Sequence, residues 1–422
     1  MSLSKIAILG GGRIPFQPSG TVYKNLSNFD LIKSAMLGVI NKTAIDKNEI
    51  DNVLIGNVIQ EVKTSNVARE AALQVGIPKN VHATTIAQAC ISSSQCVSIG
   101  MDKIKTGESK LVLAGGVETF SDVPIRYPRK MRKWLIDFPK ESKKGKFNLL
   151  KYVSKLGPSY FKPEPPALAN FTTGELMGTT SEKIAQRFGV TRNDQDEFTV
   201  RSHNLAFGAH TKGYYINEIF PYNGKFMENN IRPKIDIKQI NNLKPSFIKN
   251  GTHTAANSTG LTDGASACLI SSEQTASDLG EIPLGYIEDS VFVGTDPFEE
   301  MLLGPAYAIP KLLERNNLTL NDIDVFEIHE AFAGQILANL SALNNDTFCK
   351  ENFNKDKLGE IPIDKLNTWG GSLAIGHPLA ASNIRNIMTA VNRLRNENKE
   401  LALVAACADS GLANAMLIKR SY

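Results

Sequence analysis

The sequence has few cysteines, no CxxC pair and no long apolar run. Its five cysteines are Cys90, Cys96, Cys268, Cys349 and Cys407. An odd number of widely spaced cysteines argues against a disulfide framework and a structural zinc site, and it is typical of free thiols in a reducing compartment. The apolar segments also fall short of the roughly 20 residues that a membrane-spanning helix requires.

The sequence also has little net charge. Lys and Arg number 47 against 43 Asp and Glu, which gives +4, too little for the whole surface to attract nucleic acid. The 422 residues are 42% hydrophobic and 21% charged, the balance of an ordered enzyme of two or three domains. The start, MSLSKIAILG, lacks a signal peptide and an Arg-rich presequence. We therefore expect a cytoplasmic protein, as in a bacterium, or a mitochondrial one if a presequence was trimmed.

Short apolar runs alternate with longer helical patterns along the chain. The first of these segments are Lys5–Leu9, Leu31–Asn41, Val53–Ile55, Ser92–Lys105 and Leu111–Ala114. Strands that are apolar throughout, separated by helices, predict an α/β protein whose parallel or mixed sheet is covered on both faces. The second half repeats the pattern, since EIDNVLI resembles DIDVFEI at 322–328, and LVLAGG resembles LALVAAC at 401–407. This similarity predicts a divergent duplication.

The composition changes between the two halves. The window 126–162 holds twelve Lys or Arg against two acids, and aromatic and apolar residues are interleaved with the charge. We expect an inserted loop subdomain at 121–252 that begins with a basic helical hairpin at 126–162. The N-terminal half then comprises 1–120 plus 253–280, and the C-terminal half comprises 281–422.

A thiol stands at the start of a predicted helix, in the segment TTIAQACISSSQCVSIG. The helix dipole and unpaired N–H groups at that end favour a thiolate, which makes Cys90 a candidate nucleophile. The alternative is that Cys90 is one more small buried residue. Cys96 lies inside the helix, and we expect it to be structural.

Three further segments place reactive side chains at the ends of elements. In TWGGSLAIGHP, the loop fixes His377 between Gly and Pro, which suits proton transfer but equally suits a turn histidine. Cys407 ends a buried strand and is followed by Asp409, and His329 lies between a strand and a helix. Two thiols and two imidazoles in corresponding regions of the two halves are the parts that nucleophilic catalysis needs.

These segments resemble the four catalytic loops of the thiolase family, in the same chain order and over essentially the full length. The matching motifs are ACISSSQ, HEAFAGQ, GGSLAIGHP and the CxxxG pattern at Cys407. The segments SDVPIRYPRKMRKWL and RPKIDIKQINNLKPSFIKNGTHTAANSTGLTDGAS are most similar to the trifunctional-protein β-subunit and fatty-acid-oxidation branch. The resemblance implies duplicated α/β halves stacked in five αβαβα layers.

The resemblance also implies a reaction, the cleavage of a 3-ketoacyl-CoA by CoA to acetyl-CoA and an acyl-CoA two carbons shorter. By motif position, Cys90 is the acylated nucleophile, His377 its base and Cys407 the second acid/base. His329 and His377 hold the first oxyanion, and the backbone N–H groups of Cys90 and Asp409 hold the second.

The resemblance implies that CoA is a substrate and that no cofactor or metal is bound permanently. The residues that it places against CoA or the acyl group are Thr259, Met177, Gly178 and Phe332. It also implies a homodimer or tetramer, and an α subunit with hydratase and dehydrogenase activity as a partner.

Two segments depart from the family pattern. Asp409 and Ser410 replace small residues, and a carboxylate that pointed inward there would oppose a developing oxyanion. In GHPLAASNIR, Ala380, Ser382 and Asn383 also differ from the usual residues. Alternative functions are therefore a weakly active acyl-CoA-binding paralogue and a biosynthetic acetoacetyl-CoA thiolase. A β-ketoacyl synthase is disfavoured by Cys407, because such enzymes generally lack a second catalytic thiol.

The basic window has three interpretations. A nucleic-acid site is the least favoured, because no recognition motif accompanies the charge. A solvated face that attracts CoA phosphates is the second. The third is peripheral contact with an anionic membrane through 126–162, since Lys and Arg interleaved with Trp, Phe and Leu suit a bilayer surface. The resemblance favours the third.

Overall fold

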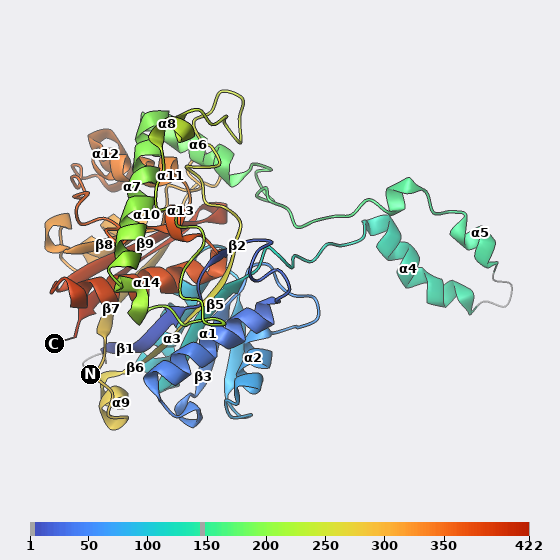
Figure 1. The fold of residues 1–422 in the computed structure, drawn as a ribbon, viewed down its shortest axis with the longest axis horizontal. Coiled ribbons are helices and arrows are strands. Elements are labelled where there is room, and N and C mark those ends of the chain that lie inside the picture. Colours follow the sequence, from blue (N-terminus) through green and yellow to red (C-terminus); the bar gives the residue numbers. More distant parts are fainter. Residues whose placement is uncertain (1–4, 144–147, 422) are drawn as a thin grey trace.

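The computed structural model describes residues 5–143 and 148–421, and within these ranges the strands form one mixed sheet with helices on both sides (Figure 1). The strand order is β4-β3-β5-β6-β1-β7-β10-β9-β8, and β2 pairs with β6. The strands are β1 (Ile6–Arg13), β2 (Gln17–Pro18), β3 (Asn52–Gly56), β4 (His82–Ile86), β5 (Leu111–Glu118), β6 (Thr262–Ser272), β7 (Gly285–Gly294), β8 (Val325–Ile328), β9 (Leu401–Ala408) and β10 (Leu412–Arg420).

The helices follow the predicted alternation. They are α1 (Asn28–Thr43), α2 (Val67–Val75), α3 (Ser92–Lys105), α4 (Arg129–Ser142), α5 (Leu149–Val153), α6 (Met177–Arg187), α7 (Arg192–Thr211), α8 (Ile237–Asn241), α9 (Glu273–Asp278), α10 (Pro305–Arg315), α11 (Ala333–Leu343), α12 (Asp346–Phe353), α13 (Ser372–Ile375) and α14 (Ser382–Asn396). In addition there are short 3₁₀ turns, of which Leu379–Ala381 and Asp409–Gly411 bear on the site.

Local chemistry explains where these elements begin and what they bury. A capping box between Ser27 and Asp30 starts α1, whose buried residues recur at helical spacing from Leu31 to Val39. The strand β1 is buried at all eight positions, as expected for a strand with helices over both faces.

The two halves have the same topology. In the first half the order β1-β6-β5-β3 has antiparallel, antiparallel and parallel pairings, and β7-β10-β9-β8 repeats them in the second half. Where the first half continues with β4, the second has an isolated parallel bridge between Phe326 and Leu366. The halves join where β1 pairs antiparallel with β7. The predicted duplicated α/β fold is confirmed.

Two helices form the central layer between the sheet halves. Apolar residues of α3 and α14 share one core with both sets of strands, while α1 and α2 cover the outer face of the first half. Helices α10 and α11 cover the outer face of the second half. Every residue of α14 from Ser382 to Leu394 is buried. The result is the predicted αβαβα stack.

The segment after β5 leaves the core as an extended arm that carries α4 and α5 (Figure 1). Trp134 on α4 stacks on Tyr152 with ring centroids 4.9 Å apart, and the Tyr152 hydroxyl donates to the Trp134 carbonyl at 2.9 Å. The helical hairpin was predicted at 126–162, and its residues 144–147 lie outside the described residues. In the described part of the chain, no helix is long and apolar enough to cross a membrane.

The rest of the predicted insertion returns to the core, where α6 and α7 pack against α11. The strand β6 then enters the first half of the sheet between β5 and β1. The proposed boundaries at 121 and 252 stay a prediction.

A buried ionic cluster ties this insertion to both halves. The Arg13 guanidinium on β1 lies 2.6 Å from the Glu218 carboxylate and 2.6 Å from that of Glu228, and all three side chains are fully buried. Thr389 and Asn392 of α14 donate to Glu218 as well. The two acidic charges keep the pKa of Arg13 raised although burial opposes it. Without Arg13, the two buried carboxylates would lose the cation that they share.

We expect Arg13→Met to lower the free energy of unfolding by about 3–5 kcal/mol, because it leaves two buried carboxylates without a cation. Urea denaturation measures this change. Lys5→Met is the matched control, since the Lys5–Glu273 pair is about half exposed and 3.6 Å long, and it should cost less than about 1 kcal/mol. Equal effects of the two substitutions would contradict the prediction.

Candidate active site

Cys90 is presented on a tight turn between β4 and α3. Ala89, just before it, has a φ of 47°, a left-handed conformation that is costly for a residue other than glycine. Ser92 holds this turn because its hydroxyl donates to the Ala89 carbonyl at 2.7 Å and accepts from the Gln88 N–H at 2.8 Å. Cys90 is partly exposed, while the other four cysteines are buried.

The structure brings His377 to Cys90 from the other half of the chain. Its Nε2 lies 3.3 Å from the Cys90 sulfur, and its Nδ1 lies 2.6 Å from the Ser382 hydroxyl. Burial lowers the pKa of His377 to about 3, so the ring is neutral at physiological pH. With the proton on Nδ1 donated to Ser382, Nε2 can accept the proton of the thiol.

Cys90 itself is a thiol at rest, which corrects the expected thiolate. Burial raises its pKa to about 12, and the nearby Asp409 carboxylate adds to the rise. Hydrogen bonds from the backbone N–H groups of Asp409 and Cys90 oppose the shift without reversing it. The helix N-terminus is therefore outweighed by desolvation, and ionisation requires transfer of the proton to His377.

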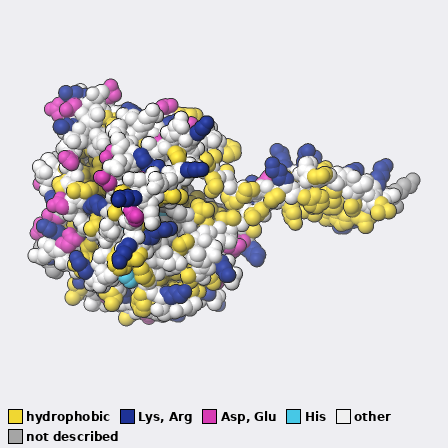
Figure 2. Space-filling view, turned by 45° about the horizontal axis from the view of Figure 1, so that its top comes forward, with side chains coloured by type: hydrophobic (Ala, Val, Ile, Leu, Met, Phe, Trp, Pro, Cys, Tyr) yellow, Lys and Arg dark blue, Asp and Glu magenta, His cyan; other side chains and the backbone are white. Residues whose placement is uncertain are grey.

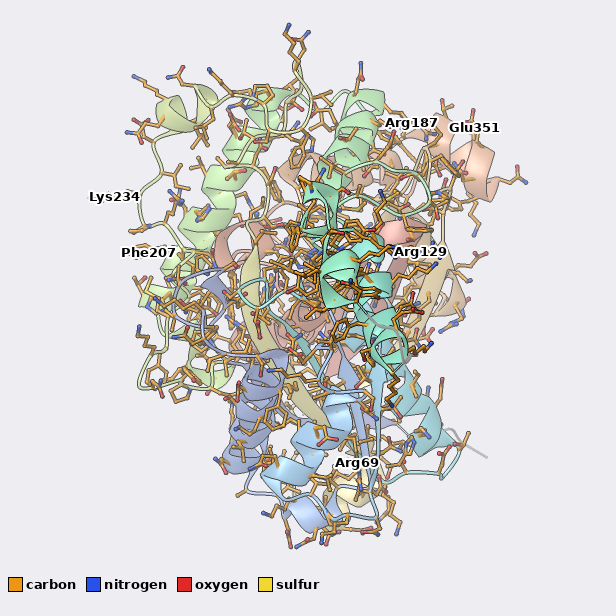
Figure 3. All side chains as sticks on the ribbon, turned by 90° about the vertical axis from the view of Figure 1, so that its right-hand side faces the viewer. Arg69, Arg129, Arg187, Phe207, Lys234 and Glu351 are labelled. Carbon is orange, nitrogen blue, oxygen red and sulfur yellow. The ribbon has the colours of Figure 1, made fainter. Side chains whose placement is uncertain are left out.

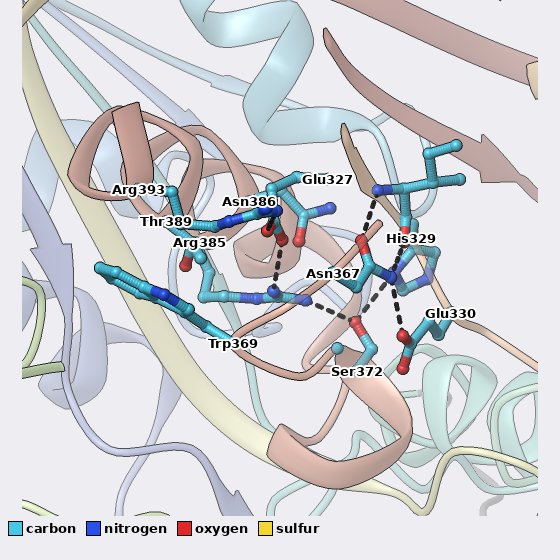
Figure 4. Close-up of polar contacts among 12 residues, drawn as sticks. Glu327, His329, Glu330, Asn367, Trp369, Ser372, Arg385, Asn386, Thr389 and Arg393 are labelled. Carbon is cyan, nitrogen blue, oxygen red and sulfur yellow. Dashed lines mark hydrogen bonds and ion pairs between the residues drawn. The ribbon is translucent and has the colours of Figure 1, made fainter. Parts of the chain in front are cut away.

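His329 lies beside His377, with ring centroids 4.2 Å apart. Its Nδ1 is 3.0 Å from the Ser372 hydroxyl, which accepts from the Arg385 guanidinium at 2.9 Å (Figure 4). Because Arg385 can only donate, the hydroxyl proton is left for His329 Nδ1, which places the ring proton on Nε2. That Nε2 is buried and has no partner within the described structure. In this tautomer, Nε2 carries a proton that no group of the described residues accepts.

A network of buried charged residues lies next to His329 and Ser372 (Figure 4). Glu327 on β8 lies 2.7 Å from Arg393 and 3.7 Å from Arg385, both on α14. Burial raises the pKa of Glu327 to about 7. The adjacent Glu330 accepts from Asn367 and Ser202, each at 2.7 Å. These contacts fix the loops that carry His329 and His377.

Cys407 and Asp409 approach Cys90 from the end of β9. Cys407 is buried, and its pKa is raised by burial and then by the charge that Cys90 would carry. The Asp409 backbone N–H points at Cys90, but the Asp409 carboxylate accepts from Asn170 at 2.7 Å and from the Ser410 N–H at 2.6 Å. The structure thus brings His377, Cys407 and the Asp409 backbone N–H to the Cys90 sulfur, with His329 beside His377.

The four residues predicted to contact CoA or substrate lie farther out. Thr259 donates from its N–H and its hydroxyl to the Ala331 carbonyl, each at 3.1 Å, on the loop that follows His329. Phe332 is buried against Phe247, with centroids 5.7 Å apart. A Cβ at Gly178 would overlap the Phe247 ring, and Met177 packs against the outer core of the second half.

A cleft of about 560 Å³ opens next to this region. Ser258 and Gly260, the neighbours of Thr259, line it together with Leu373, His203, Arg232 and Lys234. The four predicted contact residues are not among its lining. Lys234 marks the outer edge of the molecule in Figure 3, well away from Arg129 of the arm.

Several residues of the site were missed from the sequence. They are Asn170, Ser372, Ser382 and Arg385, together with Asn383, whose amide donates to the Cys90 carbonyl at 2.9 Å. Ser382 and Asn383 were noticed only as departures from the family pattern. Polar residues at every turn of α14 were a signal that could have found Arg385. No pattern pointed to Asn170.

The comparisons with known proteins agree with this geometry. Residues 6–274 match the family profile "Thiolase, N-terminal domain", and residues 281–420 match "Thiolase, C-terminal domain". This chain belongs to the thiolase family. The predicted resemblance is confirmed. In the described residues of this thiolase, no group of three or more His, Cys, Asp or Glu is arranged to hold a metal ion.

Its sequence relatives include the mouse "Trifunctional enzyme subunit beta, mitochondrial", 47% identical over 99% of this chain and 89% of the relative. The "3-ketoacyl-CoA thiolase" of Serratia proteamaculans is 37% identical over 98% of this chain and 97% of the relative. The predicted branch is therefore confirmed, and mitochondrial and bacterial proteins both match.

Solved structures match over the whole chain. Human mitochondrial 3-ketoacyl-CoA thiolase in complex with CoA has a TM-score of 0.84 at 28% identity, covering 100% of this chain and 99% of that one. The Bacillus anthracis acetyl-CoA acetyltransferase has a TM-score of 0.83 at 28% identity, with 99% of each chain covered.

We expect iodoacetamide to label Cys90 selectively, because the other four thiols are buried. Since the pKa of Cys90 is raised, its thiolate fraction and its labelling rate should still be rising at pH 10, where an ordinary thiol has levelled off. Peptide mass spectrometry across a pH series measures both. A rate that is already constant below pH 8 would contradict the prediction.

Proposed function

We propose that this thiolase cleaves 3-ketoacyl-CoA of medium or long chain with CoA, in fatty-acid β-oxidation, and that Cys90 carries the acyl group. The protein is an acyltransferase by its family, and relatives named 3-ketoacyl-CoA thiolase support the reaction. The observation that carries the roles is the 3.3 Å contact between the Cys90 sulfur and His377 Nε2.

In the first half-reaction, the Cys90 sulfur attacks the 3-keto carbon while its proton passes to His377 Nε2. The carbonyl oxygen becomes an oxyanion that accepts from His329 Nε2–H and from the newly formed His377 Nε2–H. The C2–C3 bond then breaks, and its electron pair stays on C2 of acetyl-CoA. Cys407 gives its proton to that carbon, which leaves an acyl thioester on Cys90 and a thiolate on Cys407.

In the second half-reaction, Cys407 takes the proton of an incoming CoA thiol. The CoA sulfur attacks the thioester carbonyl, whose oxyanion accepts from the backbone N–H groups of Cys90 and Asp409. Collapse releases the shortened acyl-CoA, and the Cys90 sulfur recovers its proton from His377. The raised pKa of Cys407 suits this cycle, because the thiol keeps its proton until the carbanion takes it, and the thiolate that remains is basic enough to deprotonate the CoA thiol.

We propose that CoA lies in the cleft beside Ser258 and Gly260. Arg232 and Lys234 supply positive charge for its phosphates, and the apolar lining includes Leu373. Thr259, Met177, Gly178 and Phe332 are proposed to shape the channel between this cleft and the sulfur. CoA enters as a substrate, and no permanently bound cofactor takes part in the steps above.

A biosynthetic acetoacetyl-CoA thiolase is the second candidate, because the structural match to an acetyl-CoA acetyltransferase is as extensive. A weakly active acyl-CoA-binding paralogue is less well supported, since the Asp409 carboxylate is bonded to Asn170 and Ser410. A preference for short-chain substrate would distinguish the biosynthetic thiolase from the proposed function. An absence of turnover would distinguish the acyl-CoA-binding paralogue.

We expect thiolysis of 3-ketohexadecanoyl-CoA to exceed that of acetoacetyl-CoA, followed through the loss of enolate absorbance on addition of CoA. Cys90→Ala should lower the rate at least 10³-fold, because the acyl group has no acceptor, whereas Cys349→Ala, at a buried position of the outer helix α12, should retain it. Mass spectrometry of the Cys90 peptide after exposure to acyl-CoA alone should show the acyl adduct. Cleavage that survives in Cys90→Ala would refute the assignment.

We further propose that the arm contacts an anionic membrane. Figure 2 shows hydrophobic side chains along one face of the arm and Lys and Arg along the opposite face. Ile136 is 65% exposed and Leu150 83% exposed, far more than a free-standing helix pair normally leaves in water. Basic residues beside an apolar face suit a bilayer surface, where each contributes about 1 kcal/mol.

The subunit partners are proposed from the same resemblance. Relatives named as the β subunit of a trifunctional enzyme support an α subunit as partner, and β4 at one end of the sheet order offers an edge for a homodimer or for the dimers of a tetramer. We propose one of two compartments from these relatives. One is the bacterial cytoplasm, with the protein at the membrane periphery, and the other is the mitochondrion.

We expect charge reversal of Arg129, Lys130, Arg132 and Lys133 to Glu to lower binding to anionic phospholipid vesicles at least 100-fold, because the electrostatic contribution of four residues changes sign. Vesicle co-sedimentation measures this. The matched control reverses the charge of four lysines on the surface of the core and should change vesicle binding little. These are Lys311, Lys350, Lys355 and Lys357. Undiminished binding of the arm variant would disprove membrane contact, and thiolysis of dissolved short-chain substrate verifies that the variant is folded.

A further inference from the structure

Asn170 is bonded at every polar group that it has. Its backbone N–H donates to the Glu175 carbonyl and its carbonyl accepts from the Gly174 N–H, each at 2.9 Å. Its side-chain oxygen accepts from the N–H groups of Thr172 and Thr173, at 3.0 and 2.9 Å. Its side-chain nitrogen is thereby aimed in one direction, toward the turn that follows Cys407.

That nitrogen holds the turn beside the nucleophile. It donates to the Asp409 carboxylate at 2.7 Å and to the Ser410 hydroxyl at 3.0 Å. The same carboxylate oxygen accepts from the Ser410 N–H at 2.6 Å, and Ser410 has a φ of 67°. The Gly411 carbonyl at the other end of the turn accepts from the Thr295 N–H at 2.7 Å. The turn is thus fixed at both ends.

We propose that Asn170 is a positioning residue of this thiolase, which holds the Asp409 carboxylate against Ser410 so that the Asp409 N–H, and not the carboxylate, faces the Cys90 sulfur. This inference rests on the proposed acylation of Cys90. It explains how a chain with an acidic residue at this turn keeps an oxyanion site, because a carboxylate bonded twice cannot rotate toward the developing charge.

The four charged or titratable groups around Cys90 come from three parts of the fold. They are His377 before α14, Asp409 after β9, Cys407 at the end of β9 and Glu118 at the end of β5. Burial raises the pKa of Glu118 to about 7. Of these, only Asp409 is bonded to Asn170, so an effect of Asn170 that passes through charge must disappear when the Asp409 charge is removed.

The test exchanges the amide and the carboxylate. Asn170→Asp sets two carboxylates against each other, and it should lower kcat about 10-fold with little change in KM and move the rise of Cys90 alkylation about one pH unit higher. Adding Asp409→Asn to Asn170→Asp removes one of the two opposed carboxylates and permits an amide-to-carboxylate hydrogen bond in the reverse direction. Because the Asp409 oxygen that accepts from Asn170 also accepts from the Ser410 N–H, an amide nitrogen in its place loses that second bond. The swapped variant should therefore recover part of kcat and return the alkylation profile toward that of the wild type.

Two controls complete the experiment. Thr173→Ala removes a hydroxyl that accepts from Glu175 on the same loop, and it should change neither readout. If Asn170→Asp fails to fold, Asn170→Ala takes its place in the experiment. It should show the same defects in kcat and alkylation, in smaller measure. A swapped variant as impaired as Asn170→Asp, or one whose defects add, would overturn the proposal.

The two readouts separate this inference from the proposed function. Alkylation of Cys90 needs no substrate, so rescue of its pH profile in the swapped variant supports the positioning role even if the wild-type protein cleaves no 3-ketoacyl-CoA. If the wild type cleaves 3-ketoacyl-CoA but the swapped variant is not rescued, the proposed function stands and the positioning role of Asn170 is wrong.

Discussion

The burial of α3 and α14 between the two halves of the sheet is the constraint on which the site depends. Stacking the halves brings the N-terminal ends of these helices together, so Asn383 at the start of α14 bonds the Cys90 carbonyl at 2.9 Å and His377 meets the Cys90 sulfur at 3.3 Å. Cys90 belongs to one half and His377 to the other. The two side chains meet because the duplicated halves share one central layer.

The same burial determines how the site works. Burial raises the pKa of Cys90 and lowers that of His377, so in the proposed reaction the proton passes between them during the chemistry and not in the resting state. The cost of buried charge is met by fixed pairs, chiefly Glu327 with Arg393 and Arg385. Through Ser372, this network also sets which nitrogen of His329 carries its proton.

The arm and the CoA cleft use surfaces that the central layer leaves free. The arm carries its charge away from the core, while Arg232 and Lys234 lie at the mouth of the cleft. The surface proposed for membrane contact is therefore distinct from the cleft proposed for CoA.

The sequence by itself determined the alternation of strands and helices, the duplication and the four loops with Cys90, His329, His377 and Cys407, because local periodicity and short motifs encode them. It misjudged the ionisation of Cys90, since desolvation depends on what packs around a residue. Only the tertiary structure decided the tautomer of His329 and the direction of the Asp409 carboxylate. Those depend on Arg385 and on Asn170, and Asn170 lies more than 200 residues from Asp409 along the chain, a separation that no local pattern can bridge.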